Sequence, residues 1–121
     1  MFYVLISGKR DFDDFERFRG VLDESLKDVE GEIEIVEGGA RGTDALARKY
    51  ALEHGLKCRE FPALWGVSGS AAGPIRNSEM VEFVSGKPGK AVFFWDGLSR
   101  GTGDCLRKAK KAGIICEIHI I

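Results

Sequence analysis

Arginine and glycine gather in four short segments of this 121-residue chain. Each segment carries one arginine, and these are Arg10, Arg41, Arg76 and Arg100. A guanidinium group presents N–H donors in a planar fork that matches the oxygens of a phosphate group. The four segments therefore indicate recognition of a phosphorylated ligand, provided that the fold brings them together.

The segment EGGARGTDAL, residues 37–46, ends a run of β-branched residues and leads directly into helix-forming sequence. A helix begins with unpaired backbone N–H groups and about half a positive charge, so its first turn attracts an anion. Gly38, Gly39 and Gly42 would let an anion reach this backbone, although tight turn geometry alone is the alternative explanation. The hydroxyl of Thr43 can either cap its own helix or donate to a phosphate oxygen.

The order Arg-Gly-Thr occurs again at Arg100, Gly101 and Thr102, directly after Ser99. Two helix beginnings together with arginine forks could hold a phosphorylated ligand with micromolar affinity, about 8 kcal/mol. For Arg41 and Arg100, ion pairs with acidic neighbours on the surface are the alternative explanation. A third turn of the same kind contributes the candidate residues Gly8, Lys9 and Arg10.

Three aspartates near these turns are candidates for contact with the ligand. Asp44 could stabilise the first turn of its helix or bond a ribose hydroxyl. Asp96 could meet the ligand, a magnesium ion or a neighbouring backbone N–H. Hydrolysis would need a carboxylate beside the ribose and a means of activating water. Asp44, Asp96 and Asp104 are the candidates for that carboxylate, and the sequence does not assign the catalytic role to any one of them.

Composition limits the classes of function. Two histidines and three cysteines without CxxC spacing predict neither a metal site nor a disulfide framework, and favour a reduced cytoplasm. The formal charge of −1 means that nucleic-acid binding would need a local basic patch. The apolar runs are far shorter than the roughly 20 residues of a membrane helix. No membrane partner is expected.

The candidate residues must be positioned by alternating strands and helices. Strands are predicted at residues 2–7, 33–38, 57–61 and 91–95, and over the closing segment IICEIHII. Helices are predicted at residues 12–29, 43–55, 74–84 and 99–113. Asp13 with Glu16 could cap the first helix, Pro74 suits the first position of the third, and residues 62–73 show no period and are predicted as a long loop.

Such alternation with short connections predicts a three-layer α/β sandwich with five parallel strands, formed as one domain over residues 1–121. Ligands of open parallel sheets bind beyond the carboxyl ends of the strands. The four arginine-bearing segments are the strand-to-helix connections and should meet at that edge. Residues 11–37, with eleven acidic and three basic side chains, should form a distant acidic face.

Two residues in the third connection, Arg76 and Trp65, each allow more than one explanation. A cation in the first turn of a helix opposes the helix dipole, so Arg76, followed by Asn77, should have a partner. That partner could be the ligand, Glu79 or Glu82. Trp65 could stack on a base or anchor the loop. We expect replacement of Arg76 by alanine to abolish ligand binding without unfolding the protein.

Three ordered segments of the chain resemble the YspA-like members of the SLOG superfamily, which are Rossmann-like nucleotide-binding proteins. They are GGARGTDALARKYALEHGL, AAGPIRNSEM and WDGLSRGTGDCLRKAKKAGI. The resemblance extends from the first strand to about Ile115. It implies a Rossmann-like fold and a ligand that is a nucleoside monophosphate or an NAD- or ADP-ribose-like molecule. Its phosphates or ribose would lie over residues 38–43 and 99–102, with Arg76 and Asn77 reaching in.

The same superfamily includes single-stranded DNA-binding proteins of the Smf/DprA type and phosphoribohydrolases of the LOG type. The first alternative would need a basic groove with exposed aromatic side chains. The second uses a glutamate where this chain has Cys105, and Asp104 one position earlier would point about 100° away. The reaction of LOG-type phosphoribohydrolases is therefore not predicted for this chain. The resemblance also implies a homodimer that pairs through helices near the site.

Overall fold

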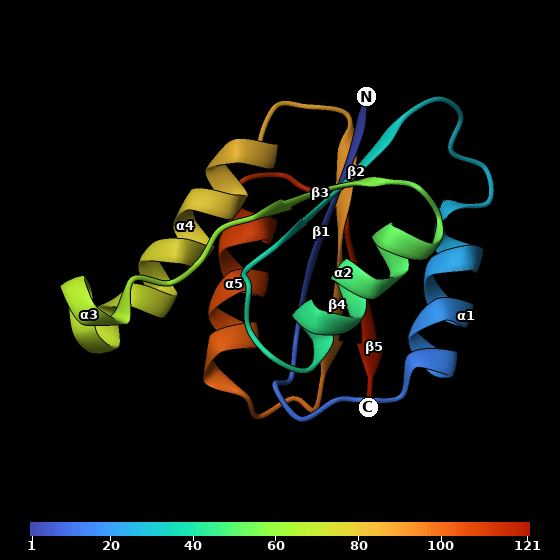
Figure 1. Ribbon diagram of the computed structural model, residues 1–121. Helices are drawn as coiled ribbons and strands as arrows, with labels where there is room; N and C mark the ends of the chain where they lie inside the picture. Colours follow the sequence, from blue (N-terminus) through green and yellow to red (C-terminus); the bar gives the residue numbers. More distant parts are fainter.

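Five parallel strands form one sheet in the order β3-β2-β1-β4-β5. The computed structural model describes residues 1–121, and the chain can be followed from strand to strand in Figure 1. The strands are β1 (Phe2–Gly8), β2 (Ile33–Glu37), β3 (Lys57–Glu60), β4 (Gly89–Trp95) and β5 (Cys116–Ile120). The predicted α/β fold with a five-stranded parallel sheet is confirmed, and it is Rossmann-like.

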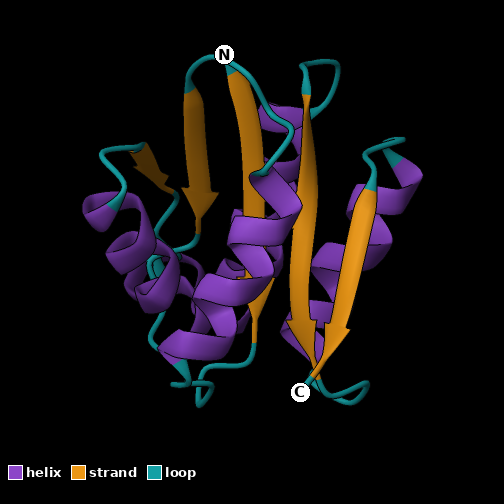
Figure 2. Cartoon of the chain, turned by 90° about the vertical axis from the view of Figure 1, so that its right-hand side faces the viewer, coloured by secondary structure: helices purple, strands orange, loops and turns teal.

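Helices cover both faces of the sheet, as Figure 2 shows. The longer helices are α1 (Phe15–Leu26), α2 (Thr43–Glu53), α4 (Ala72–Val84) and α5 (Arg100–Lys111). Alternate residues of the central strands serve the two layers: Val4 and Phe94 pack with α1 and α2, whereas Leu5 and Phe93 pack with α4 and α5. Apolar side chains on both strand faces explain why β1 and β4 read as continuous apolar runs. None of the helices combines the length and the apolar composition needed to cross a bilayer.

Three local predictions are wrong. The helix α1 begins at Phe15, so Asp14, rather than Asp13 with Glu16, caps it by accepting the Arg17 N–H at 3.0 Å. Residues 62–73 are not all loop, because they contain the short helix α3 (Trp65–Ser68) and a 3₁₀ turn, η1 (Gly69–Ala71). Pro74 is the third residue of α4 instead of the first. Proline is tolerated there because N–H groups of the first turn have no helical acceptor.

The strand order reverses between β1 and β4, which positions the candidate site. From β1 the chain builds outward to β2 and β3, whereas β4 and β5 lie on the other side of β1. The connections that leave the carboxyl ends of β1 and β4 therefore turn to opposite faces of the sheet. A crevice opens between them, which is where open α/β sheets bind ligands.

Candidate functional site

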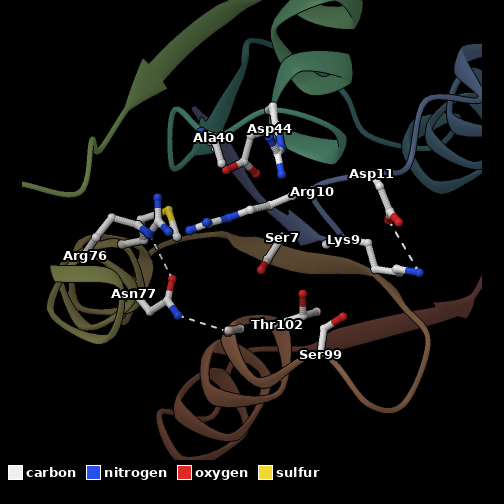
Figure 3. Close-up of a pocket in the computed structure, with 14 residues that line it drawn as sticks. Ser7, Lys9, Arg10, Asp11, Ala40, Asp44, Arg76, Asn77, Ser99 and Thr102 are labelled. Atoms are coloured by element: carbon white, nitrogen blue, oxygen red, sulfur yellow. Dashed lines mark hydrogen bonds and ion pairs between the residues drawn. The ribbon is translucent and has the colours of Figure 1, made fainter. Parts of the chain in front are cut away.

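A hollow of about 390 Å³ occupies this crevice. Its walls come from the end of β1, the turn between β2 and α2, the first half of α4 and the start of α5, as seen in Figure 3. Ten of the residues predicted from sequence line it: Gly8, Lys9, Arg10, Arg41, Asp44, Arg76, Asn77, Ser99, Gly101 and Thr102. The other six predicted residues, Gly38, Gly39, Gly42, Thr43, Asp96 and Arg100, do not line this hollow.

A second hollow of about 420 Å³ adjoins the first. The two share Arg10, Ala40, Arg41 and Arg76 as lining residues, so together they form one continuous cleft. The second hollow adds the backbone of Gly38 and Gly39, the start of the segment after β3, and the indole of Trp65. The cleft thus has a polar half at the sheet edge and a half with an aromatic wall.

Arg10 and Arg41 line both hollows and form no ion pair. The Arg10 guanidinium lies over the Trp65 ring, 5.3 Å from its centroid. Arg100 likewise has no acidic partner, so the surface ion pairs considered for Arg41 and Arg100 are absent. Two guanidinium groups without a counter-charge leave the cleft strongly attractive to an anion.

Arg76 and Asn77, both buried, connect three segments of the cleft wall. Arg76 donates Nη1–H to the Gly38 carbonyl at 2.5 Å and Nε–H to the Asn77 side-chain oxygen at 3.1 Å. The Asn77 amide donates to the Gly101 carbonyl and to Asp104, each at 3.1 Å. The partner of Arg76 is therefore the turn after β2, not Glu79 or Glu82. Two of its five N–H groups are used, which leaves three for a ligand.

Gly38 and Gly42, which follow β2, lie in close contact with other segments of the chain. A Cβ atom on Gly38 would overlap the Arg76 guanidinium, and one on Gly42, whose φ is +71°, would overlap the backbone of Arg10. Thr43 is fully buried, and both its N–H and its hydroxyl donate to the Lys9 carbonyl, at 3.1 and 2.9 Å. The Lys9 carbonyl therefore occupies both donors of Thr43, whereas the N–H groups of Asp44 and Ala45 in the same turn have no acceptor in the protein.

The Asp96 carboxylate holds the connection that leads into α5. The Asp96 carboxylate accepts the N–H groups of Leu98 and Ser99, both at 2.8 Å, and lies 3.5 Å from the Lys9 ammonium. These N–H groups hold the pKa of Asp96 well below its usual range. Of the three contacts considered for Asp96, the backbone N–H is the one observed.

After Ser99, the first backbone N–H group with an acceptor is that of Gly103, which donates to the Ser99 carbonyl at 3.1 Å. The N–H groups of Arg100, Gly101 and Thr102 have no acceptor in the protein. Gly101 and Thr102 line the first hollow. The start of α5 therefore offers free backbone donors to an anion in this hollow.

Asp44 is the most enclosed carboxylate of the cleft. It is largely buried and accepts the Ala40 N–H at 3.2 Å. Burial raises its pKa, while that N–H and the nearby Arg76 act in the opposite direction. Asp104 instead pairs with Lys108 at 2.9 Å, and Cys105 is fully buried, which raises its thiol pKa to about 12. No group of three or more His, Cys, Asp or Glu side chains is arranged to hold a metal ion.

Sequence reasoning missed four residues that line the first hollow: Ser7, Asp11, Ala40 and Met80. Ser7 and Asp11 flank the predicted segment at the end of β1, so extending that segment by one residue each way would have included them. Met80 lies one helical turn after Arg76, and the i, i+4 spacing of a helix places both on one face.

Glu37 is a further residue that the sequence did not single out. It is fully buried at the end of β2, where its Oε1 accepts the Gly39 N–H at 2.6 Å and an Arg48 N–H at 2.8 Å. Burial raises its pKa to about 7; the Gly39 N–H and Arg48 act against this, whereas Asp44 and Glu60 add to it. Through the Gly39 N–H, the Glu37 carboxyl stabilises the turn between β2 and α2, which contains Arg41.

The raised pKa of Glu37 makes stability depend on pH. Between its ordinary value of 4.5 and about 7, the folded protein retains a proton that the unfolded chain has released. The free energy of unfolding is therefore highest below pH 4.5. It falls by up to about 3 kcal/mol as the pH rises from 4.5 through about 7. Urea unfolding at a series of pH values should show this fall. In Glu37→Gln the curve should be flatter, and an equal slope in both proteins would show that another group is responsible.

Two comparisons with known proteins agree with this architecture. The family model described as "YspA, cpYpsA-related SLOG family" matches residues 2–66, which run from β1 through the turn after β2 into the first half of α3. "Gene 61 protein" of Mycobacterium phage D29 is 36% identical over 118 residues, which cover 92% of this chain and 90% of the phage protein. The first match includes more than half of the chain, and the second extends over α4 and α5 as well. This chain therefore belongs to the YspA, cpYpsA-related SLOG family.

Proposed function

We propose that this protein binds a nucleotide or a nucleotide derivative in the cleft, as a sensor or sequestering domain. The observation that carries this proposal is the pair Arg10 and Arg41, which lack acidic partners and line the same hollow as Gly101 and Thr102, whose N–H groups are free. The first hollow is lined by four cations and two carboxylates, namely Lys9, Arg10, Arg41, Arg76, Asp11 and Asp44. An excess of two positive charges suits a phosphate group.

The parts of the cleft suit the parts of a nucleotide. The phosphates would accept from the N–H groups of Gly101 and Thr102 and from the guanidinium of Arg41. Asp44 would accept from a ribose hydroxyl, and the base would lie in the second hollow beside Trp65. Because the two hollows adjoin, a molecule of ADP-ribose or NAD type would use more of the cleft than a nucleoside monophosphate.

Native mass spectrometry of freshly purified protein, followed by calorimetric titration, tests this function. The spectrum should contain a co-purified nucleotide, or the titrations should show binding of ADP-ribose, NAD or AMP and much weaker binding of adenosine. Titrations with and without magnesium would show whether the metal accompanies the nucleotide. Absence of binding by every phosphorylated ligand would overturn the proposal.

Arg41→Ala should weaken nucleotide binding by about 10- to 100-fold, because a hydrogen bond to a charged group contributes about 1.5 to 3 kcal/mol. The Arg41 side chain forms no ion pair within the protein, so the thermal unfolding midpoint should stay unchanged. Arg19→Ala is the matched control, since Arg19 lies on the surface of α1, where its only ion pair is with Glu16. Equal affinity of the two variants would remove Arg41 from the site.

Single-stranded DNA remains the alternative ligand, and salt distinguishes it. Binding to an oligonucleotide would release many counterions and weaken steeply with salt, whereas binding to a mononucleotide would respond much less. The same titrations, repeated at two salt concentrations with an oligonucleotide, separate the two ligand classes. Tight, steeply salt-dependent binding of the oligonucleotide would favour the DNA-binding role.

A further inference from the structure

The two edges of the sheet differ in character. All four residues of β3 are exposed, and Lys57, Arg59 and Glu60 give this edge three charges. Charged side chains protect an edge strand against pairing with another chain. On the opposite edge, Ile118 and Ile120 of β5 are 39% and 61% exposed. Figure 2 shows β5 at the border of the sheet, with no strand on its outer side.

The outer backbone of β5 is available for pairing. The Ala91 N–H donates to the Ile115 carbonyl, and the Ile121 N–H donates to the Trp95 carbonyl. In a parallel ladder, the N–H and C=O groups of one residue point to the same neighbouring strand, and those of the next residue point away from it. Since Ile115 and Ile121 bond to β4, the backbone groups of Cys116, Ile118 and Ile120 point to the outer side of β5. Only the Ile120 carbonyl has a partner there, an Arg17 N–H at 2.7 Å, and its second lone pair stays free.

We propose that β5 pairs antiparallel with β5 of a second copy of this chain, about a two-fold axis at Ile118. This register places Ile118 opposite Ile118 of the second copy and Cys116 opposite Ile120, so the outward backbone groups of both strands meet. The two sheets become one sheet of ten strands. The apolar side chains of both copies share one face, because residues opposite each other across a strand pair point the same way.

The charges of β5 favour a second copy as the partner. In this register Glu117 lies opposite His119 of the second copy on the face towards α1, where cross-strand Cβ atoms are about 5 Å apart. Within one copy, Nε2 of His119 is buried and has no hydrogen-bond partner. Within its own copy Glu117 already accepts from Ser25 and Lys90 through Oε2, so its free Oε1 would face the imidazole of the second copy, twice in the dimer. A register shifted by two residues would lose both pairs.

Edge pairing of five residues forms a small interface, so the dimer should be weak and in exchange with the monomer. Sedimentation velocity of the ligand-free protein over a range of micromolar concentrations should show a monomer–dimer equilibrium. Ile118→Lys places a charge on the two-fold axis and should weaken dimerisation by more than about tenfold. Leu52→Lys, at a residue of α2 that is 84% exposed, is the matched control and should leave the equilibrium unchanged.

Cross-linking tests the register itself. In a protein whose Cys58 and Cys116 are replaced by serine, Ile118→Cys would bring two thiols together on the axis. Cα atoms of such a hydrogen-bonded pair are about 5.5 Å apart, within the range for a disulfide. Oxidised glutathione should then yield a covalent dimer, as two protein thiols are oxidised to one disulfide and glutathione is reduced to two thiols. Leu52→Cys should not form this dimer.

A protein that stays monomeric at all concentrations would overturn the proposal. So would a dimer that tolerates Ile118→Lys, because it would use another face, such as the helices near the cleft. Equal cross-linking of Ile118→Cys and Leu52→Cys would have the same meaning. Since these measurements contain no nucleotide, their outcome is independent of whether the cleft binds one.

Discussion

Replacing Arg76 by alanine is expected to lower the free energy of unfolding by about 3 to 5 kcal/mol, as when a buried charge loses its partner. The substitution removes the donor to the Gly38 carbonyl and takes from the buried Asp44 carboxylate the cation that most favours its charged form. Urea unfolding measures the loss. From sequence alone we expected this variant to lose binding and keep its fold, but the buried contacts of Arg76 change that expectation.

A double-mutant cycle with Asp44→Asn shows whether charge balance is the cause. A neutral amide in place of the Asp44 carboxylate would need no counter-charge, so the Asp44→Asn/Arg76→Ala protein should recover part of the stability lost in Arg76→Ala. Arg19→Ala on the surface should cost no more than about 0.5 kcal/mol. Fully additive effects of the two substitutions would show that Arg76 stabilises the protein only through the Gly38 turn.

Gly42→Ala should have the second largest effect, about 3 kcal/mol of stability or more. Gly42 has φ +71° and ψ −126°, a conformation that only glycine adopts readily. A methyl group there would also meet the backbone carbonyl of Arg10, which cannot move without disturbing the connection after β1. Thermal and urea unfolding should both show the loss.

Gly20→Ala is the matched control for this substitution. Gly20 lies within α1, and a Cβ atom there would meet no other atom within 4 Å. Since alanine is the better helix former, the control should gain up to about 1 kcal/mol. If Gly42→Ala were as stable as the control, close contact with Arg10 could not be the reason for glycine at this turn.

Much of the fold could be predicted because local sequence and tertiary structure agree. Buried parallel strands need apolar side chains on both faces, and FYVLIS and AVFFW show this directly. Gly55 and Gly113 follow their helices with φ of +64° and +79°, the conformation that ends a helix. The helix α3 could not be found this way, because four residues are too few to show a period. Its Trp65 packs against Gly73, a contact that only the folded chain reveals.

The site was predictable in location but not in detail. The strand-to-helix connections share one edge of the sheet, so most of the candidate residues converge there. Thr43 and Thr102 follow the same Arg-Gly pair, yet the first donates to the Lys9 carbonyl and the second lines the cleft. Which polar groups stay free depends on contacts between segments distant in sequence. No local pattern contains that information.

The bridge formed by Arg76 and Asn77 has a consequence for how the cleft receives its ligand. It fastens the turn after β2, helix α4 and the start of α5 to one another before any ligand arrives. A preorganised cleft spends little conformational entropy on binding. We therefore expect free and liganded forms to share nearly the same backbone, so that recognition follows a lock-and-key course without closure of a lid.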